Sequence, residues 1–170
     1  LGHNLIRHDL EMIREIAPAH PLLRLPVIDT LILSPIAFPE NPYHRLVKDY
    51  KLVRESLNDP VADARQAASL FEDEFKSLDG LHQTEPALFE LLHFLLATPE
   101  SREDMPAMGM EMVFAALGGK RPDEDRALSL CRGLLGKWAC ASFPVTPALV
   151  QTRAQRLALA FAVTWLRVAG

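Results

Sequence analysis

Apolar residues recur at helical spacing at the start of the chain, where Asn4 can cap a helix and Pro18 can end it. The apolar side chains of this stretch fall on one stripe, formed by Leu5, Met12, Ile13 and Ile16. Asp9 lies in the middle of that stripe. An ionised carboxylate loses its hydration on burial, so it needs an ionic partner or a metal there. Asp9 is therefore the first candidate for a functional residue.

A short β-rich segment follows at residues 27–29, within the sequence LPVIDTLIL, and it is the best strand candidate in the chain. The prolines of residues 34–42 predict a loop. Residues 43–57 return to helical spacing. A further helix is predicted over residues 60–80, because an Asp-Pro pair favours its start and an Asp-Gly pair favours its end.

From residue 81 onward the pattern predicts helices alone, so we place a domain boundary near Gly80, between residues 1–80 and residues 81–170. The helices are predicted from Pro86 onward, over residues 105–117, over residues 122–138, and from Pro147 to the end of the chain. The first of them is so apolar that it should be buried on most sides. The methionines of the second are predicted to fill the core, with a binding face as the alternative.

Composition and charge fit a globular protein. The chain has 170 residues, of which 49% are hydrophobic and 24% charged, and these values suit one ordinary domain or slightly more. The net charge of −4 argues against a basic nucleic-acid coat, although it permits a metal site that handles phosphates. Cys131 and Cys140 are interpreted as core thiols in a reducing compartment, which predicts a cytoplasmic protein.

We expect no membrane association. There is no signal-peptide pattern, and the most apolar run, residues 157–168, is shorter than the roughly 20 residues that span a bilayer. Arg167 also interrupts that run. Because the chain opens at Leu1 almost directly into a helix and ends on an apolar one, we expect it to be part of a longer protein.

Asp63 is the natural partner of Asp9, because both lie near the starts of helices that follow loops and both could face a common cleft. Each of the two residues also has a plainer interpretation. Asp63 would be a solvated surface acid, or Asp9 would pair with Arg7 or Arg14, or its helix phase would differ from the one assumed. The acidic run at residues 72–74 is interpreted as solvent-exposed.

Three segments in order resemble one known family. GHNLIRHDL (residues 2–10), PVIDTLILSPIAFPENPYHRLVKDYKLV (26–53) and NDPVADARQAASLF (58–71) are similar to the second, middle and third motif regions of DEDD-type 3′-to-5′ exonucleases. More specifically, they resemble the exonuclease-like modules of RecQ-type DNA helicases. The resemblance implies an α/β, ribonuclease-H-like fold that lacks its first strands, followed by an all-α region leading toward a helicase core that is absent from the chain. The protein would be predominantly helical overall.

The resemblance also implies a mechanism. Asp9 and Asp63 would hold Mg2+ or Mn2+, and two such ions about 3.5–4 Å apart would cleave a phosphodiester at a DNA 3′ end during repair. The position of the family's general-base histidine is Asn58, and an amide cannot take a proton from water. The family's first motif is a strand that carries Asp-x-Glu and would lie upstream of Leu1, and no β-rich run in this sequence replaces it. We therefore expect weak metal binding and little cleavage by the chain alone.

Other side chains near the expected cleft are candidates for contacts with single-stranded DNA or a 3′ end, and with RNA as a further possibility: His3, Asn4, His44 and Lys48. Packed histidines and a solvated basic surface are the plainer interpretations. Two further hypotheses remain open at this stage. One is a non-catalytic nucleic-acid-binding or scaffold domain that docks the helicase, and the other is a helical protein whose likeness to the exonucleases is accidental.

Overall fold

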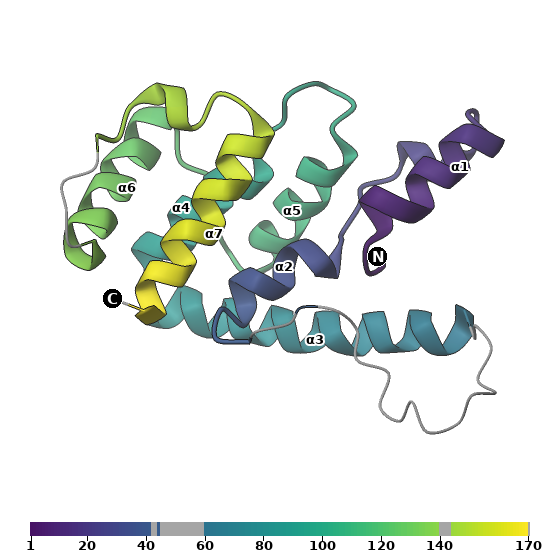
Figure 1. Ribbon diagram of the computed structural model, residues 1–170, viewed down its shortest axis with the longest axis horizontal. Coiled ribbons are helices and arrows are strands. Elements are labelled where there is room, and N and C mark those ends of the chain that lie inside the picture. The colour runs from purple at the N-terminus through teal and green to yellow at the C-terminus, as the bar shows by residue number, and fades with distance from the viewer. Residues whose placement is uncertain (42–43, 45–59, 140–143, 170) are drawn as a thin grey trace.

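The computed structural model describes residues 1–41, 44, 60–139 and 144–169, which form helices joined by loops (Figure 1). The helices are η1 (Leu5–Asp9), α1 (Leu10–Ile16), η2 (Pro21–Arg24), α2 (Thr30–Ala37), α3 (Pro60–Thr84), α4 (Pro86–Ala97), α5 (Met105–Ala116), α6 (Glu124–Trp138), η3 (Pro147–Leu149) and α7 (Arg153–Ala169). None of the helices in these residues is long and apolar enough to cross a membrane.

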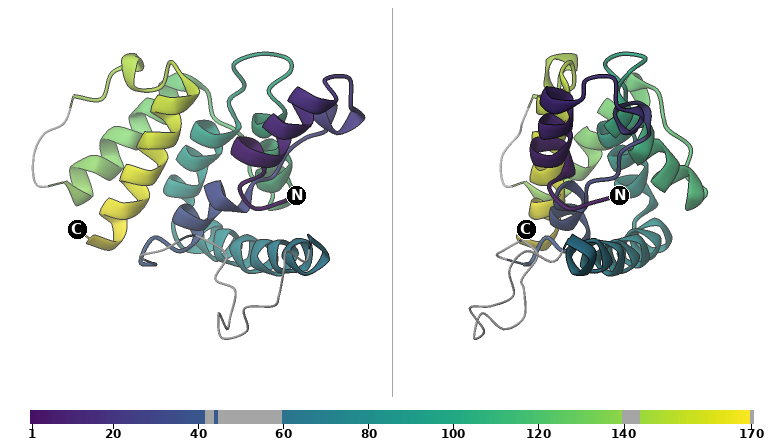
Figure 2. Two further views of the ribbon diagram at one scale, coloured as in Figure 1. Left: turned by 45° about the vertical axis from the view of Figure 1, so that its right-hand side comes forward. Right: turned by 90° about the vertical axis from the view of Figure 1, so that its right-hand side faces the viewer.

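Helix α4 occupies the centre of the molecule. It packs against α3, α5, α6 and α7, and the two views of Figure 2 show these helices grouped around it. Nine of its residues are buried: Leu88, Phe89, Leu91, Leu92, His93, Phe94, Leu95, Leu96 and Ala97. A helix that is apolar on nearly all sides is stable only when it is surrounded, so the predicted burial of this helix is confirmed.

The predicted α/β fold is wrong, because the described residues contain no β-sheet. The predicted strand at residues 27–29 forms only an isolated parallel bridge between Gly2 and Asp29. Asp29 then caps α2: its side-chain oxygen accepts the Leu31 N–H at 3.0 Å. The apolar residues after Asp29 form a helix. This helix continues through Pro35 to Ala37, into the segment predicted as a loop.

Helix α3 lies across one side of the helical group (Figure 1) and is longer than predicted. It passes through Gly80, the predicted stop, and ends at Thr84. A glycine inside a helix costs only about 1 kcal/mol, and the burial of Leu81 in the next position offsets that cost. The acidic run at residues 72–74 is also different from the prediction, because Glu74 is fully buried.

The core extends across the predicted domain boundary. Leu33 and Ile36 of α2 and Leu78 of α3 belong to the same buried cluster as the apolar side chains of α4 to α7. The boundary at Gly80 itself falls inside α3. Helix α1, in contrast, packs mainly against its neighbours η1 and η2 in the chain, and Figure 1 shows it projecting from the rest of the molecule.

Three of the remaining helix predictions are confirmed, one helix is shorter than predicted, and one lies outside the described residues. The helix expected from Asn4 to Pro18 is present as η1 followed by α1, and those over residues 105–117 and 122–138 are present as α5 and α6. The last helix begins at Arg153, because Pro147–Leu149 forms only a short 3-10 turn. The helix predicted over residues 43–57 lies outside the described residues.

Two predictions about sulfur-containing side chains are only partly confirmed. Cys131 is a buried free thiol of α6, as expected, whereas Cys140 lies outside the described residues. Among the methionines of α5, Met110 fills the core, but Met108 and Met112 are exposed. Core filling therefore explains only part of this methionine pattern.

Candidate functional site

The first residues form a turn that is fixed to the start of α2. The Gly2 N–H donates to the Ile28 carbonyl at 3.1 Å, and the Thr30 N–H donates to the Gly2 carbonyl at 3.0 Å. Nδ1 of His3 lies 2.8 Å from the Thr30 hydroxyl. Asn4 adopts a left-handed conformation with φ of 61°, which asparagine tolerates better than most residues. The Gly-His-Asn sequence therefore fixes where η1 begins.

Asp29 holds this turn from the inside. It is 2% exposed, and its carboxylate accepts the backbone N–H groups of Asn4 (2.8 Å), Ile6 (2.9 Å) and Leu31 (3.0 Å). One side chain thus caps the start of η1 and the start of α2. Asn4 makes no side-chain cap bond, so the cap predicted for it is supplied by Asp29 instead. An Asp-Thr pair before an apolar run is a recognisable cap signal for α2, but it does not reveal that the same Asp29 also caps η1.

Asp9 is not buried on an apolar stripe. It ends the π-helical turn η1, its side chain is 51% exposed, and His8 lies beside it with an Nδ1–Oδ1 distance of 3.3 Å. The wider π-helical turn shifts the phase of the residues that follow, so Leu10 is buried while Met12 and Ile16 are exposed. The predicted burial of Asp9 is therefore wrong, and its exposed carboxylate is accessible to a ligand.

Both predicted metal ligands lie within the described residues, Asp9 at the end of η1 and Asp63 in α3. Asp63 is partly buried in the first turn of α3. In the described parts of the chain, no group of three or more histidine, cysteine, aspartate or glutamate side chains is placed to hold a metal ion. Asn58 and Lys48, two further predicted site residues, lie outside the described residues.

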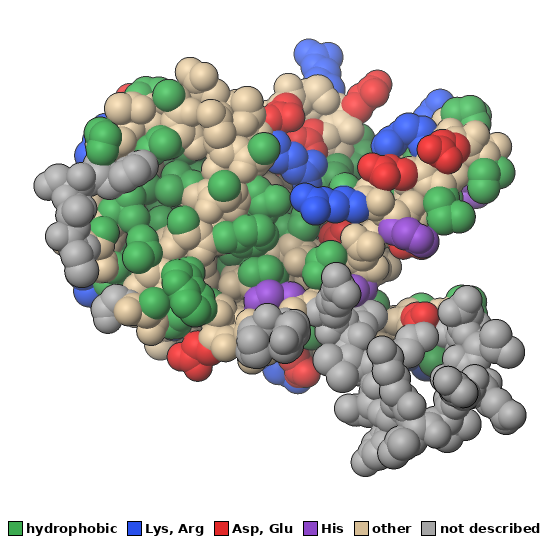
Figure 3. Space-filling view, viewed as in Figure 1, with side chains coloured by type: hydrophobic (Ala, Val, Ile, Leu, Met, Phe, Trp, Pro, Cys, Tyr) green, Lys and Arg blue, Asp and Glu red, His purple; other side chains and the backbone are tan. Residues whose placement is uncertain are grey.

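Two of the predicted contact residues, Asn4 and His44, line a groove of about 770 Å³ between the N-terminal turn, α2 and the start of α7. We call it the α2–α7 groove. Its apolar floor comes from two helices and consists of Ile32, Pro35, Leu157 and Phe161. Arg7 and Arg153 also line it, and Figure 3 shows positive side chains gathered next to a hydrophobic surface on this face of the molecule.

The two arginines of the groove differ in their surroundings. Nη1 of Arg153 lies 3.0 Å from Oδ1 of Asp104, the buried cap of α5, so this guanidinium is fixed and largely neutralised. Arg7 is exposed and forms no ion pair with the described residues. Glu100 also lines the groove and accepts a hydrogen bond from the Arg153 backbone N–H. Arg7 is therefore the cation best placed to contact an anionic ligand.

Two of the predicted contact residues, His3 on the N-terminal turn and His44 in the groove, are shifted toward the neutral form. Burial lowers the pKa of His3, and the nearby Asp29 charge opposes this shift only in part. Burial also lowers the pKa of His44, whose Nδ1 is buried and has no hydrogen-bond partner among the described residues. A neutral imidazole offers one donor and one acceptor, so His44 could bind a polar ligand without adding positive charge.

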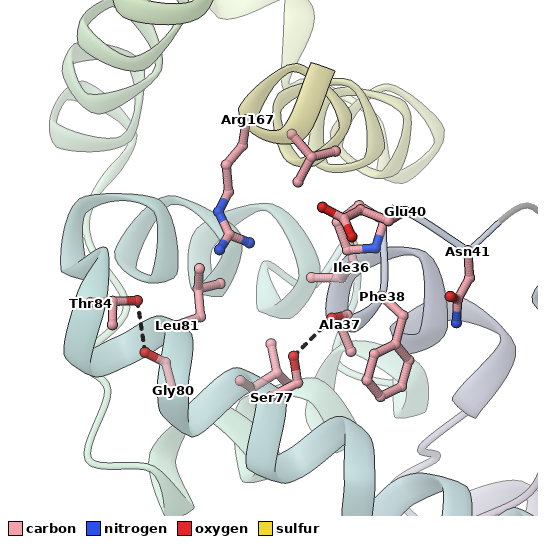
Figure 4. A pocket seen from close by; sticks show the side chains of 13 residues that line it. Ile36, Ala37, Phe38, Glu40, Asn41, Ser77, Gly80, Leu81, Thr84 and Arg167 are labelled. Carbon is pink, nitrogen blue, oxygen red and sulfur yellow. Dashed lines mark hydrogen bonds between the residues drawn. The ribbon is translucent and has the colours of Figure 1, made fainter. Parts of the chain in front are cut away.

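A second cavity, of about 390 Å³, lies between the end of α2, α3 and the end of α7 (Figure 4). Three of its polar side chains already have partners. The Ser77 hydroxyl donates to the Ala37 carbonyl at 2.8 Å, the Thr84 hydroxyl donates to the Gly80 carbonyl at 2.9 Å, and Nε of Arg167 donates to Glu85. None of the predicted site residues lines this cavity. The α2–α7 groove is therefore the better candidate site.

Comparison of the chain with known protein families, with curated proteins and with solved structures gives no match.

Proposed function

We propose that the chain is a nucleic-acid-binding module that holds a single-stranded segment or a 3′ end in the α2–α7 groove. The observation that carries the proposal is the combination of an apolar floor, which includes Phe161, with the exposed guanidinium of Arg7. Nucleic-acid bases pack on aromatic and apolar side chains whatever their sequence, and phosphates bind arginine. Asn4 and His44 add polar contacts at the same site.

The motif resemblance suggests DNA as the nucleic acid, with RNA as the alternative, and a RecQ-type helicase as the covalently linked partner. Catalysis by the chain alone is disfavoured by its own residues. Asn58 cannot act as a general base, and the sequence holds no β-rich run that carries the family's Asp-x-Glu motif. Asp29, the buried carboxylate that holds the N-terminal turn, already accepts three backbone N–H groups. The proposal is therefore of binding without cleavage.

The binding test compares the wild type with Arg7→Ala, and with Arg132→Ala as a matched control on the exposed side of α6. Fluorescence anisotropy of a labelled oligothymidylate is measured over a range of salt concentrations. We expect Arg7→Ala to weaken binding and to reduce the slope of log K against log salt by about 1, because one phosphate contact is lost. Equal binding by both variants would contradict the groove as the binding site.

One observation favours a second candidate function, a weak metal-dependent 3′-to-5′ exonuclease. The Asp9 carboxylate is exposed at the end of η1, the turn that begins at the fixed Gly-His-Asn sequence, and Mg2+ or Mn2+ can reach it there. The test follows trimming of a 5′-labelled strand in Mn2+ by the wild type, by Asp9→Ala and by Glu15→Ala, an exposed acid of α1. Trimming that only Asp9→Ala abolishes would establish this activity, and equal trimming by all three would exclude Asp9 as a ligand.

A further inference from the structure

Glu74 is a carboxyl group in an unusual position. It lies in the second half of α3, its side chain is fully buried, and neither of its oxygens has a hydrogen-bond partner among the described residues. A buried carboxylate without a partner is costly, because it loses its hydration and gains nothing in return. The neutral carboxylic acid loses much less on burial. The surroundings of Glu74 therefore favour its protonated form.

The groups that face Glu74 come mainly from α2. Ser34 is buried on α2 and its hydroxyl is close enough to lower the pKa of Glu74, although it completes no hydrogen bond of normal geometry. The Asp29 carboxylate at the start of α2 repels a negative charge on Glu74, and it is already saturated by backbone donors. His3, on the N-terminal turn beside Asp29, has a pKa lowered by burial and supplies little compensating charge.

The ionisable groups of α4, the other helix packed against α3, are engaged elsewhere. Glu90 pairs with Arg126 of α6 at 3.0 Å, and Nε2 of His93 lies 3.0 Å from Oε2 of Glu111 on α5. Burial is thus the largest influence on Glu74, followed by the smaller opposing effect of Ser34 and by Asp29, and together they raise its pKa to about 8.

The two halves of α3 are held to the molecule unequally. After Glu74, Leu78 and Leu81 are buried in the common core. Before it, Ala67 is the only residue of α3 that is fully buried, while Phe71 is partly buried. Apolar burial therefore anchors the second half much more strongly than residues 60–73, the segment that carries Asp63. A charge on Glu74 would act at the junction between these halves.

We propose that Glu74 is a protonation switch for the contact between α2 and α3. As a carboxylic acid it allows the two helices to pack. As a carboxylate it places a second negative charge near Asp29, which opposes this packing and loosens residues 60–73, the less buried half of α3. The proton leaves to solvent when the contact opens, so no other reactant is needed. The switch would control the position of Asp63, and it does not depend on nucleic-acid binding.

The sign of the pH effect follows from linkage. The open form titrates near the usual value of 4.5 and the closed form near 8, so the open form binds fewer protons between these values. Opening therefore increases about tenfold for each pH unit in this range and levels off above it.

The test measures hydrogen exchange by mass spectrometry for the wild type, for Glu74→Gln and for the control Glu72→Gln. Glu72 is an exposed residue of α3 two positions before Glu74. Protection factors, corrected for intrinsic exchange, are compared at pH 5 and pH 7. In the wild type and in Glu72→Gln, residues 60–73 should lose about 100-fold protection between these values. In Glu74→Gln they should lose almost none, because the amide does not titrate. Residues 124–138 of α6 should be unaffected in all three proteins.

Two results would overturn the switch. One is the same pH course in the wild type and in Glu74→Gln. The other is an equal loss of protection in residues 60–73 and 124–138, which would mean that Glu74 affects only global stability. A measurement on the wild type alone guards against a misfolded variant: the 13C signals of the glutamate carboxyl groups should include one that titrates near pH 8. If all of them titrate below pH 6, the proposal fails.

Discussion

Single side chains with long-range partners decide how the N-terminal turn is built. Asp9 and Asp29 look alike in the sequence, since each stands in an apolar segment. The structure exposes Asp9 and buries Asp29, because Asp29 alone meets three backbone N–H groups. Two of these donors, on Asn4 and Ile6, lie 25 and 23 residues away in the sequence. No local pattern can reveal such a contact.

Replacing Asp29 tests this cap. Asp29→Ala leaves three N–H groups at two helix starts without their acceptor, and we expect the free energy of unfolding to fall by about 2–4 kcal/mol. Asp123→Ala is the matched control, because Asp123 caps α6 through a single bond to the Arg126 N–H at 2.8 Å and should cost about 1 kcal/mol. Urea unfolding at pH 5, where Glu74 stays largely protonated, measures both. Equal losses would mean that Asp29 supports only one helix.

At the scale of elements, close approach of backbones positions α5. The Val27 N–H donates to the Met105 carbonyl at 2.9 Å, and a Cβ added at Gly109 would lie 2.0 Å from the Val27 carbonyl oxygen. A glycine is therefore needed at position 109 because the backbone of Val27 leaves no room for a side chain. The backbone conformation of Gly109 itself does not require glycine. Gly80, inside α3, has no atom within 4 Å of an added Cβ. Two glycines inside helices thus have different structural roles.

This difference gives opposite predictions. Gly109→Ala should lower the free energy of unfolding by about 3 kcal/mol or more, because α5 must move away from the Val27 backbone. Gly80→Ala should raise it by about 0.5–1 kcal/mol, because alanine has the higher helix propensity. Urea unfolding monitored by circular dichroism measures both changes. A stable Gly109→Ala protein would show that α5 does not pack against residue 27 in solution.

At the scale of the whole molecule, Arg156 joins segments that are distant in the chain. It is 3% exposed, and its guanidinium donates to the carbonyls of Val150 (3.0 Å), Gln151 (3.2 Å) and Thr98 (3.1 Å). Helix α7 is thereby fixed both to the turn before it and to the end of α4. A buried charge is tolerated here because several acceptors replace its hydration.

Arg156→Met tests that connection. The substitution keeps an apolar stem but removes the donor from three carbonyls, of which the Val150 carbonyl is bound in a buried position, so we expect the free energy of unfolding to fall by about 3 kcal/mol. In a chain of this size the midpoint of thermal unfolding should fall by roughly 6–12 °C. Arg132→Met, at an exposed position of α6, should change it by no more than about 2 °C. Similar midpoints for the two variants would contradict the connecting role of Arg156.

The sequence by itself determined the helices whose signals are local. Helices α4, α5 and α6 follow from apolar spacing, from Pro86 and from the acidic start of α6, because helix formation depends mainly on neighbours within a few residues. Tertiary structure decided the isolated bridge at residues 27–29, the continuation of α3 through Gly80 and the burial of Glu74. It also decided the double cap by Asp29 and the pairing of Asn4 and His44 in one groove. These features depend on contacts between segments distant in the chain, and such contacts leave no periodic pattern in the sequence.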